Sequence, residues 1–336
     1  MANAKKHKFY TSCGNPDAEN LLDRVLEEMG TALQSSGLSV YLGGSYGRGE
    51  GGVRQDSRNG ILYNDLDFFV FARSADKTAA GLLHEIAKKY EEELRVDVDF
   101  SRVMTVKDIR NNAGRLMMQE LKRGCRLVCG EDLLAEYLPE LPAEKLPFSE
   151  ACRLLLNRGM GLRFAEEKIA ERSGETDFIL RNINKAILGS GDARLLAEGR
   201  YRWRIAERSA EIENSDLPAE WKKLYKDAVA FKEAPHRNLP EDPAGLLNTV
   251  RAFYRASVLA VAGTENEAGL RQAVQKKCEL TREVSILNYI KYCVKTRKIH
   301  RDIRFLQIPP VAAVLCKLFE KDVCRDELYR LWLKFN

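Results

Sequence analysis

Two pairs of aspartates, each pair two residues apart, are the residues of this chain best suited to chemistry. Asp65 and Asp67 stand at the start of the apolar run LDFFVFA (66–72), and Asp97 and Asp99 alternate with valines in VDVDF. Residues two apart in an extended strand point to the same side, so each pair presents its carboxylates on one face. Crowded carboxylates repel one another unless a cation lies between them, and Mg²⁺ prefers oxygen ligands of this kind. The spacing therefore predicts a divalent-metal site built from the first pair and completed by a member of the second.

A third carboxylate allows two metal ions to share such a site. Two Mg²⁺ ions about 4 Å apart stabilise both the attacking and the leaving oxygen of an in-line displacement at phosphorus. Mg²⁺ is usually bound by a few carboxylates together with substrate phosphates. We therefore expect two Mg²⁺ ions at this site, with Mn²⁺ as an alternative, next to the phosphate groups of a ligand.

A glycine-rich segment precedes the first aspartate pair. Six of the ten residues in GGSYGRGEGG (43–52) are glycine. Gly43 and Gly44 remove side chains where the backbone must approach a ligand closely. Backbone N–H groups in a turn that enters a helix bind phosphates, and the hydroxyl of Ser45 adds a donor. The segment is therefore the predicted phosphate-binding element.

Arg48 and Glu50 flank these glycines, and two interpretations of the arginine stay open. Arg48 either contacts a phosphate bidentately or pairs with Glu50 or another acid. The residues that follow, 50–63, are polar and predict a loop at the mouth of the site, which either holds substrate or is simply tolerated.

The elements that must position these residues follow from the apolar periodicity. Helices are expected at 16–36, 77–94 and 106–123, strands at 38–42, 66–72 and 96–103, and a turn at the end of RLVCG (126–130). After Pro139, Pro142 and Pro147 the strand signals cease, and helices are expected at 149–170, 178–213, 219–232, 243–262, 266–279, 281–297 and 311–334. Two domains are therefore predicted, a mixed one over 1–147 and a helical one over 148–336.

The order of motifs resembles a known family. Gly-Gly-Ser, a loop, Asp-Leu-Asp and a later strand carboxylate are similar to the nucleotidyltransferase superfamily of DNA polymerase beta. The segment GGSYGRGE…NDLDFFVF is especially similar to the bacterial regulatory uridylyltransferases that modify the nitrogen-signalling protein. The resemblance covers roughly residues 38–130. It implies an α+β fold, in which a nucleotidyltransferase domain with a small mixed sheet flanked by helices precedes an all-α domain.

The same resemblance assigns roles to individual residues. The resemblance implies a nucleoside triphosphate (NTP) as the substrate. Gly44 and Ser45 match the Gly-Ser that contacts its triphosphate, and Asp65 and Asp67 match the metal-binding pair. Asp99 is favoured as the third carboxylate, because it follows the alternating valines as the family's third acid does, and Asp97 stays the alternative. In the family this third acid also serves as the general base for the incoming hydroxyl.

The helical domain offers further candidates. Lys185 and Arg181 lie four apart on one predicted helix face. Basic residues of the helical partner domain reach the triphosphate in related two-domain enzymes, which makes Lys185 a candidate NTP contact; a solvated helix face is the competing interpretation. Asp192, in the sequence GDA, is expected to cap the helix that follows.

The resemblance implies a Mg²⁺-dependent enzyme that transfers a nucleoside monophosphate from an NTP to an acceptor hydroxyl and releases pyrophosphate. Three acceptor classes stay open: a small molecule, a protein and an RNA such as tRNA. The alternative comes from a different class of function: a non-catalytic nucleotide-binding regulatory module, or a component of a toxin–antitoxin pair.

Composition sets the remaining limits. The 336 residues carry 54 Lys and Arg against 49 Asp and Glu, and 45% are hydrophobic, which is typical of a globular protein. Residues 271–336 hold 15 Lys and Arg against 7 Asp and Glu, so a tRNA acceptor would bind there. No apolar run reaches the roughly 18 residues of a membrane span, and no secretory signal begins the chain. We therefore expect a cytoplasmic protein with no membrane partner.

Overall fold

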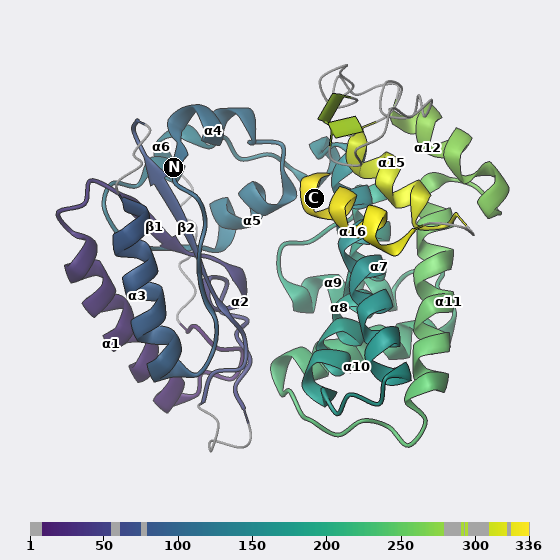
Figure 1. Ribbon diagram of the computed structural model, residues 1–336, viewed down its shortest axis with the longest axis horizontal. Coiled ribbons are helices and arrows are strands. Elements are labelled where there is room, and N and C mark those ends of the chain that lie inside the picture. Colours follow the sequence, from purple (N-terminus) through teal and green to yellow (C-terminus); the bar gives the residue numbers. More distant parts are fainter. Residues whose placement is uncertain are drawn as a thin grey trace. The chain divides into compact units, whose positions relative to one another are not determined.

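The computed structural model describes residues 9–54, 61–74, 79–278, 290–291, 293–294, 309–320 and 324–335. The chain divides into two compact units between Pro142 and Ala143, a few residues before the expected boundary at 147. Two short segments of the later chain, Trp203–Ile205 and Val229–His236, pack with the first unit. The predicted α+β class is confirmed: a mixed sheet with helices is followed by a largely helical region (Figure 1).

Among the described residues of the first unit, five strands form one sheet in the order β3-β2-β1-β5, and β4 also pairs with β2. β1 runs antiparallel to β2 and to β5, whereas β2 runs parallel to β3 and β4. The sheet is therefore mixed. The strands are β1 (Ser39–Leu42), β2 (Leu66–Ala72), β3 (Val98–Phe100), β4 (Met104–Thr105) and β5 (Arg126–Cys129).

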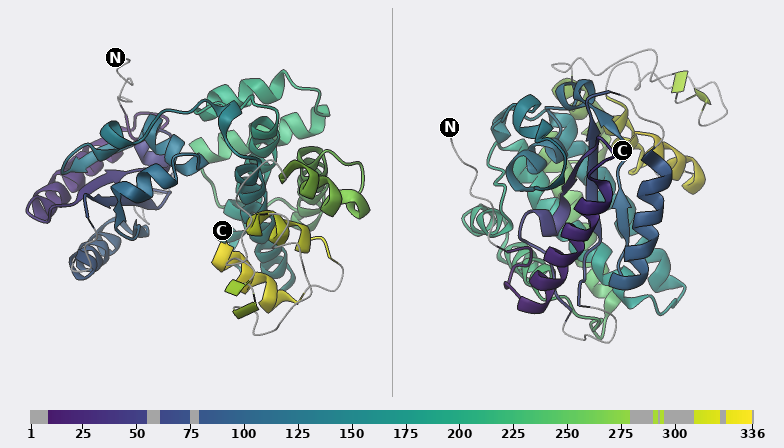
Figure 2. Two further views of the ribbon diagram at one scale, coloured as in Figure 1. Left: turned by 90° about the horizontal axis from the view of Figure 1, so that it is seen from above. Right: turned by 90° about the vertical axis from the view of Figure 1, so that its left-hand side faces the viewer.

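Helices cover both faces of this sheet. On one face α1 (Pro16–Leu33) and α3 (Ala79–Leu94) contribute Leu22, Val25 and Ile86 to a core with Val40 and Phe68; both helices lie in front of the strands in Figure 2, right. On the other face Tyr41 and Phe71 pack with residues of α4, α5 and α6. The even-numbered residues of β2 thus face α1 and α3, and the odd-numbered ones, which include Asp67, face the other side.

Local signals set the start of α1. Asn15 caps the helix, because its side-chain oxygen accepts a hydrogen bond from the N–H of Ala18 at 3.0 Å, and Pro16 occupies the first helical position. The helices of the first unit are α1 (Pro16–Leu33), α2 (Gly44–Gly47), α3 (Ala79–Leu94), α4 (Val106–Asn111), α5 (Leu116–Gly124) and α6 (Leu133–Tyr137).

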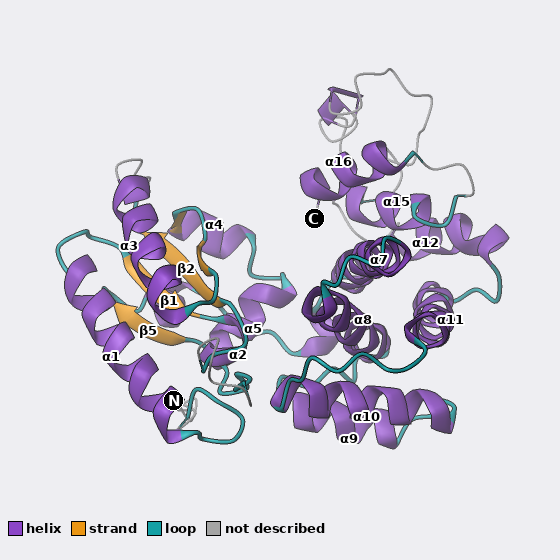
Figure 3. Ribbon diagram, turned by 60° about the horizontal axis from the view of Figure 1, so that its bottom comes forward, coloured by secondary structure: helices purple, strands orange, loops and turns teal. Residues whose placement is uncertain are grey.

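The second unit is built around α7, α8 and α11, which Figure 3 shows nearly end-on. α11 begins at Pro243 after the capping Asp242 and ends at Gly263, which adopts a left-handed φ of 75°. None of the described helices is long and apolar enough to cross a membrane. The longer helices after residue 142 are α7 (Phe148–Ala170), α8 (Thr176–Ala197), α9 (Ile205–Glu213), α10 (Ala219–Glu233), α11 (Pro243–Ala262), α12 (Leu270–Cys278), α15 (Pro310–Lys317) and α16 (Arg325–Phe335).

Three predicted helices are each divided in the structure. The helix expected over 178–213 is divided because Gly199 adopts a left-handed φ of 67°, and the chain resumes a helix only at Ile205. The helix expected over 106–123 becomes α4 and α5, and the one over 311–334 becomes α15 and α16. The helix predicted over 281–297 lies almost entirely outside the described residues.

The prediction for Asp192 was wrong, because this residue lies within α8 and caps no helix. Its Oδ1 accepts a hydrogen bond from the hydroxyl of Tyr225 at 2.6 Å and lies 3.0 Å from Nε of Arg208. Asp192 is 9% exposed and Arg208 4% exposed. The three side chains therefore form a buried polar cluster that joins α8, α9 and α10.

Replacement of Asp192 by Ala removes the carboxylate that faces the buried guanidinium of Arg208. We expect Asp192→Ala to lower the free energy of unfolding by about 3–5 kcal/mol, because removal of one member of a buried ion pair leaves the charge of the other uncompensated. The matched control is Asp227→Ala, which removes the carboxylate of an exposed pair with Lys223 on α10. Urea denaturation of both variants checks this, and equal midpoints would contradict it.

Candidate functional site

The structure places Asp67 and Asp99 opposite each other in the sheet. They are partners in the parallel pairing of β2 with β3, with Leu66 opposite Val98 on one side and Phe68 opposite Phe100 on the other. Residues opposite each other in neighbouring strands point to the same face, so the two carboxylates are on one face of the sheet. The sheet thereby brings together one aspartate from each predicted pair, Asp67 from the first and Asp99 from the second.

The other two aspartates lie at the adjoining strand starts. Asp65 precedes β2 and Asp97 precedes β3, and the N–H of Leu66 donates to the carbonyl of Asp97 at 2.9 Å. Asp65 and Asp67 are half-buried, whereas Asp97 and Asp99 are exposed. All four acids are therefore gathered where β2 and β3 begin.

The glycine segment runs directly against Asp67. The N–H of Gly43 donates to the Asp67 carbonyl at 2.8 Å, and a Cβ atom on Gly44 would overlap Oδ2 of the Asp67 carboxylate. Gly44 also adopts a left-handed φ of 58°. Only glycine meets both conditions, so the chain must lack a side chain at this position.

Packing within the unit also requires a glycine at position 43. A Cβ at Gly43 would lie 2.6 Å from the ring of Phe69 and 2.7 Å from a methyl group of Leu121. The residue thus allows β1 to end tightly against the core on the α5 side of the sheet. Ser45 follows in α2 and is half-buried.

Like charges concentrate at Asp99. Partial burial of its carboxyl, followed by the nearby negative charges of Asp65, Asp97 and Glu91, raises the pKa of Asp99 above its ordinary value. A bound cation would counter each of these effects, because it favours the ionised carboxylate. Negative charge is therefore concentrated at the start of β3, a condition under which a bound cation would be favourable.

The donor set is suited to a hard divalent cation. Carboxylate oxygens alone, contributed by neighbouring strand starts, match the preference of Mg²⁺ and leave coordination positions for water and phosphate oxygens. Among the described residues, no group of three or more His, Cys, Asp or Glu side chains already has the arrangement of a metal site. In residue type and location, Asp65, Asp67 and Asp99 fit the ion, and the charge of Asp97 acts on Asp99.

Arg48 is held by carboxylates. Its guanidinium lies 3.5 Å from Glu50 and 3.3 Å from Glu120 of α5. Of the two interpretations of Arg48, pairing with acids is the one present in the structure. Arg48 therefore joins the C-terminal end of α2 to α5.

Glu50 is the centre of a second set of contacts. The residue is 9% exposed, and its carboxylate accepts hydrogen bonds from Nζ of Lys232 and from the N–H of Ile205, each at 2.8 Å. Both partners belong to the two later segments that pack with the first unit. The glycine segment is thus fastened to parts of the chain more than 150 residues further on.

The residues of the helical region that are predicted to contact NTP or tRNA lie in the second unit. Lys185 is on α8 with an exposed side chain, and Arg181 lies one turn earlier. The basic segment 271–336 is described only in part: 279–289, 292, 295–308, 321–323 and 336 are outside the described residues. Binding of NTP by Lys185 and of tRNA by 271–336 both stay predictions.

The predicted loop 50–63 has a paired base. Val53 and Leu62 form an antiparallel bridge, and the N–H of Arg54 donates to the carbonyl of Ile61 at 2.9 Å. Leu62 and Tyr63 are buried. Residues 55–60 lie outside the described residues, so the structure describes the base of the insertion.

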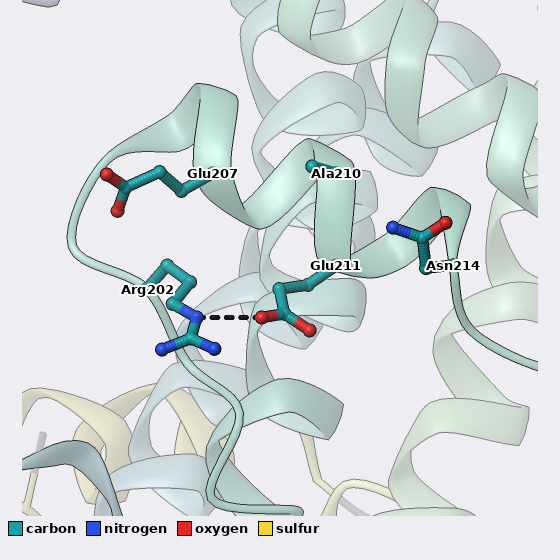
Figure 4. Close-up of a pocket in the computed structure, with 5 residues that line it drawn as sticks. All are labelled: Arg202, Glu207, Ala210, Glu211 and Asn214. Atoms are coloured by element: carbon teal, nitrogen blue, oxygen red, sulfur yellow. Dashed lines mark hydrogen bonds and ion pairs between the residues drawn. The ribbon is translucent and has the colours of Figure 1, made fainter.

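Two of the pockets formed by the described residues lie in the second unit, and none of the predicted site residues lines either of them. One, of about 450 Å³, is shown in Figure 4, where Nε of Arg202 donates to Glu211 at 2.7 Å. Hydrogen bonds from Arg202 and Arg200 lower the pKa of Glu211. The other, of about 830 Å³, lies between α7, α11 and residues 318–320, and its wall includes the ion pairs Arg251–Glu166 and Arg255–Glu267. In both, arginines on the wall face neighbouring glutamates.

Sequence reasoning missed Tyr46 and Asn64. The hydroxyl of Tyr46 accepts hydrogen bonds from the N–H of Tyr63 and of Asn64, and it donates to the carbonyl of Gly52. The sequence did contain one signal for Tyr46: it is a large aromatic residue within a run of glycines, and glycines leave room for its ring. These two residues connect the glycine segment to the start of β2.

No protein-family model matches the chain, and neither a curated protein nor a solved structure matches it. The likeness to the nucleotidyltransferase superfamily of DNA polymerase beta therefore stays a resemblance carried by the motif residues. Their placement in the first unit is the structural information that bears on function.

A Cβ atom at Gly44 should disturb the Asp67 carboxylate specifically. Gly37 is the matched control, because it adopts a left-handed φ of 71° but has no atom within 4 Å of an added Cβ. Gly37→Ala should lower the free energy of unfolding by about 1 kcal/mol, the cost of left-handed backbone. Gly44→Ala should cost about 1–3 kcal/mol more, because it also overpacks the site. Chemical denaturation measures both values, and a Gly44→Ala loss no larger than that of Gly37→Ala would refute the close approach.

Proposed function

We propose that this protein is a Mg²⁺-dependent nucleotidyltransferase, which transfers a nucleoside monophosphate from an NTP to an acceptor hydroxyl and releases pyrophosphate. The observation that carries the proposal is the pairing of Asp67 with Asp99 on adjacent parallel strands, beside a glycine turn with no room for a side chain against Asp67. Metal-dependent nucleotidyl transfer uses carboxylates and a phosphate-binding turn within reach of one ligand, and the closeness of Gly44 to Asp67 supports such an arrangement here.

Each residue of the site has a role in this reaction. Asp65, Asp67 and Asp99 would hold the two Mg²⁺ ions, or Mn²⁺ in their place, which when bound neutralise the charge of the triphosphate and of the leaving pyrophosphate. Gly44 and Ser45 would hold the phosphates, and Ser45 offers them a hydroxyl donor. Arg48 supports the turn through Glu50 and Glu120.

Asp99 would accept the proton of the acceptor hydroxyl. The hydroxyl oxygen then forms a bond to the α-phosphorus while the bond between that phosphorus and the pyrophosphate oxygen breaks. The rate would come from positioning and charge complementarity, because the chain forms no covalent bond with the substrate. Asp97 stays the alternative to Asp99 as the third carboxylate.

The acceptor is a small molecule, a protein or an RNA, and the destination of the label distinguishes them. Incubation of the protein with each α-³²P-labelled NTP and a whole-cell lysate shows which nucleotide is used. Label in protein, in RNA or in small molecules identifies the acceptor class. An RNA acceptor bound through 271–336 would also show affinity that falls steeply with salt.

Removal of a central carboxylate should abolish the reaction. We expect Asp67→Asn and Asp99→Asn each to reduce pyrophosphate release by at least about 100-fold, the scale of losing one charge-stabilising group from a preorganised site. Asp97→Asn should retain most of the activity. Comparison of this variant with Asp99→Asn therefore shows which of the two aspartates is the third carboxylate. The measurement is Mg²⁺-dependent pyrophosphate release with unlabelled NTP and lysate.

The control is Asp17→Asn, the same chemical change at an exposed position in the first turn of α1, which should leave the rate unchanged. Full activity in Asp67→Asn with its fold retained would exclude the proposed function. Nucleotide binding by the wild type without pyrophosphate release would instead favour the non-catalytic regulatory module or the toxin–antitoxin component.

A further inference from the structure

Tyr46 is buried at the centre of the glycine segment. Its side chain is 0% exposed, and the residue belongs to α2, the short helix that also contains Gly44 and Ser45. A Cβ atom at Gly51 would overlap the edge of the Tyr46 ring. The ring is therefore covered closely by the glycine run that follows it.

The hydroxyl of Tyr46 has three backbone partners. It donates to the carbonyl of Gly52 at 2.8 Å, and it accepts hydrogen bonds from the N–H of Tyr63 at 2.9 Å and of Asn64 at 3.2 Å. Burial raises the pKa of this hydroxyl above its ordinary value, so the proton that it donates to Gly52 is retained. A single oxygen atom thus joins two segments that are about ten residues apart in the chain.

These partners lie immediately before the first metal-binding candidate. Tyr63 and Asn64 are the two residues that precede Asp65 and β2. Asn64 reinforces the connection, because its Oδ1 accepts the N–H of Gly52 at 2.8 Å. The Tyr46 hydroxyl therefore connects the glycine segment to the residues immediately before Asp65.

We propose that Tyr46 is a positioning residue, whose hydroxyl sets the placement of Asp65 relative to Gly44 and Ser45. The inference rests on the proposed function for its catalytic consequence. The structural part, a hydroxyl that holds the Tyr63 and Asn64 amides, stands independently of any substrate. Phenylalanine at this position keeps the ring and leaves those amides and the Gly52 carbonyl without the oxygen that they share.

Tyr41 provides a matched control within the same unit. It is also a buried tyrosine, and its hydroxyl accepts the N–H of Leu134 at 3.2 Å and donates to Asp132 at 3.0 Å. These contacts are at the start of α6, away from the glycine segment. Tyr41→Phe therefore removes a comparable hydroxyl network without touching the candidate site.

The experiment compares Tyr46→Phe and Tyr41→Phe in the full chain by amide hydrogen exchange and by steady-state pyrophosphate release. Tyr46→Phe should speed exchange of the Tyr63 and Asn64 amides by about tenfold, and Tyr41→Phe should speed only that of Leu134. Tyr46→Phe should also lower kcat by about tenfold or more with little change in KM, because a small misplacement of reacting groups is costly. Tyr41→Phe should leave kcat unchanged.

Two results would overturn the inference. Wild-type exchange at Tyr63 and Asn64 in Tyr46→Phe would show that the hydroxyl does not hold them, and a kcat equal to that of Tyr41→Phe would show that the placement does not matter. If Tyr46→Phe does not fold, Asn64→Ala tests the same connection, because it removes the Oδ1 that accepts the Gly52 N–H, and an unchanged kcat in that variant would overturn the inference. Absence of pyrophosphate release in the wild type would refute only the proposed function. Amide exchange needs no substrate, so it would still show whether the Tyr46 hydroxyl holds the two amides.

Discussion

The repulsion between carboxylates at the starts of β2 and β3 is the constraint on which the first unit depends. Like charges directly opposite each other in neighbouring strands destabilise a sheet. Asp67 and Asp99 stand opposite each other, and Asp65 and Asp97 stand close enough to add to the repulsion at Asp99. A fold that keeps this arrangement loses stability where β2 and β3 begin and must gain it elsewhere.

The surrounding structure compensates through its two cores and a network of polar contacts around the glycine segment. Apolar side chains fill both faces of the sheet, so the strands that carry the aspartates are held from each side. The Tyr46 hydroxyl, the Glu50 carboxylate and the Arg48 guanidinium then fasten the glycine segment to the start of β2, to the later segments and to α5. Rigid support of this kind is what a site needs when its function depends on charges kept in place.

Much of the fold was predictable because its signals are local. The bounds of β2 and α11 agree with their apolar patterns, and Asn15 with Pro16 marks the start of α1. The errors occurred where a long periodic pattern contained a local interruption or a tertiary contact. Gly199 ends a helix that periodicity alone would continue, and Asp192 stays inside α8 because Arg208 and Tyr225 meet its carboxylate there.

The sequence by itself determined the chemical inventory of the candidate site: four aspartates with strand spacing, a glycine-rich turn and a serine. Residue type and two-residue spacing are properties of a few neighbouring positions, so they can be read from the chain. Only the tertiary structure decided that Asp99 is opposite Asp67, that Arg48 pairs with Glu120, and that Glu50 binds Lys232. Strand register and ion pairs between distant residues depend on which segments pack together, and no local pattern specifies that choice.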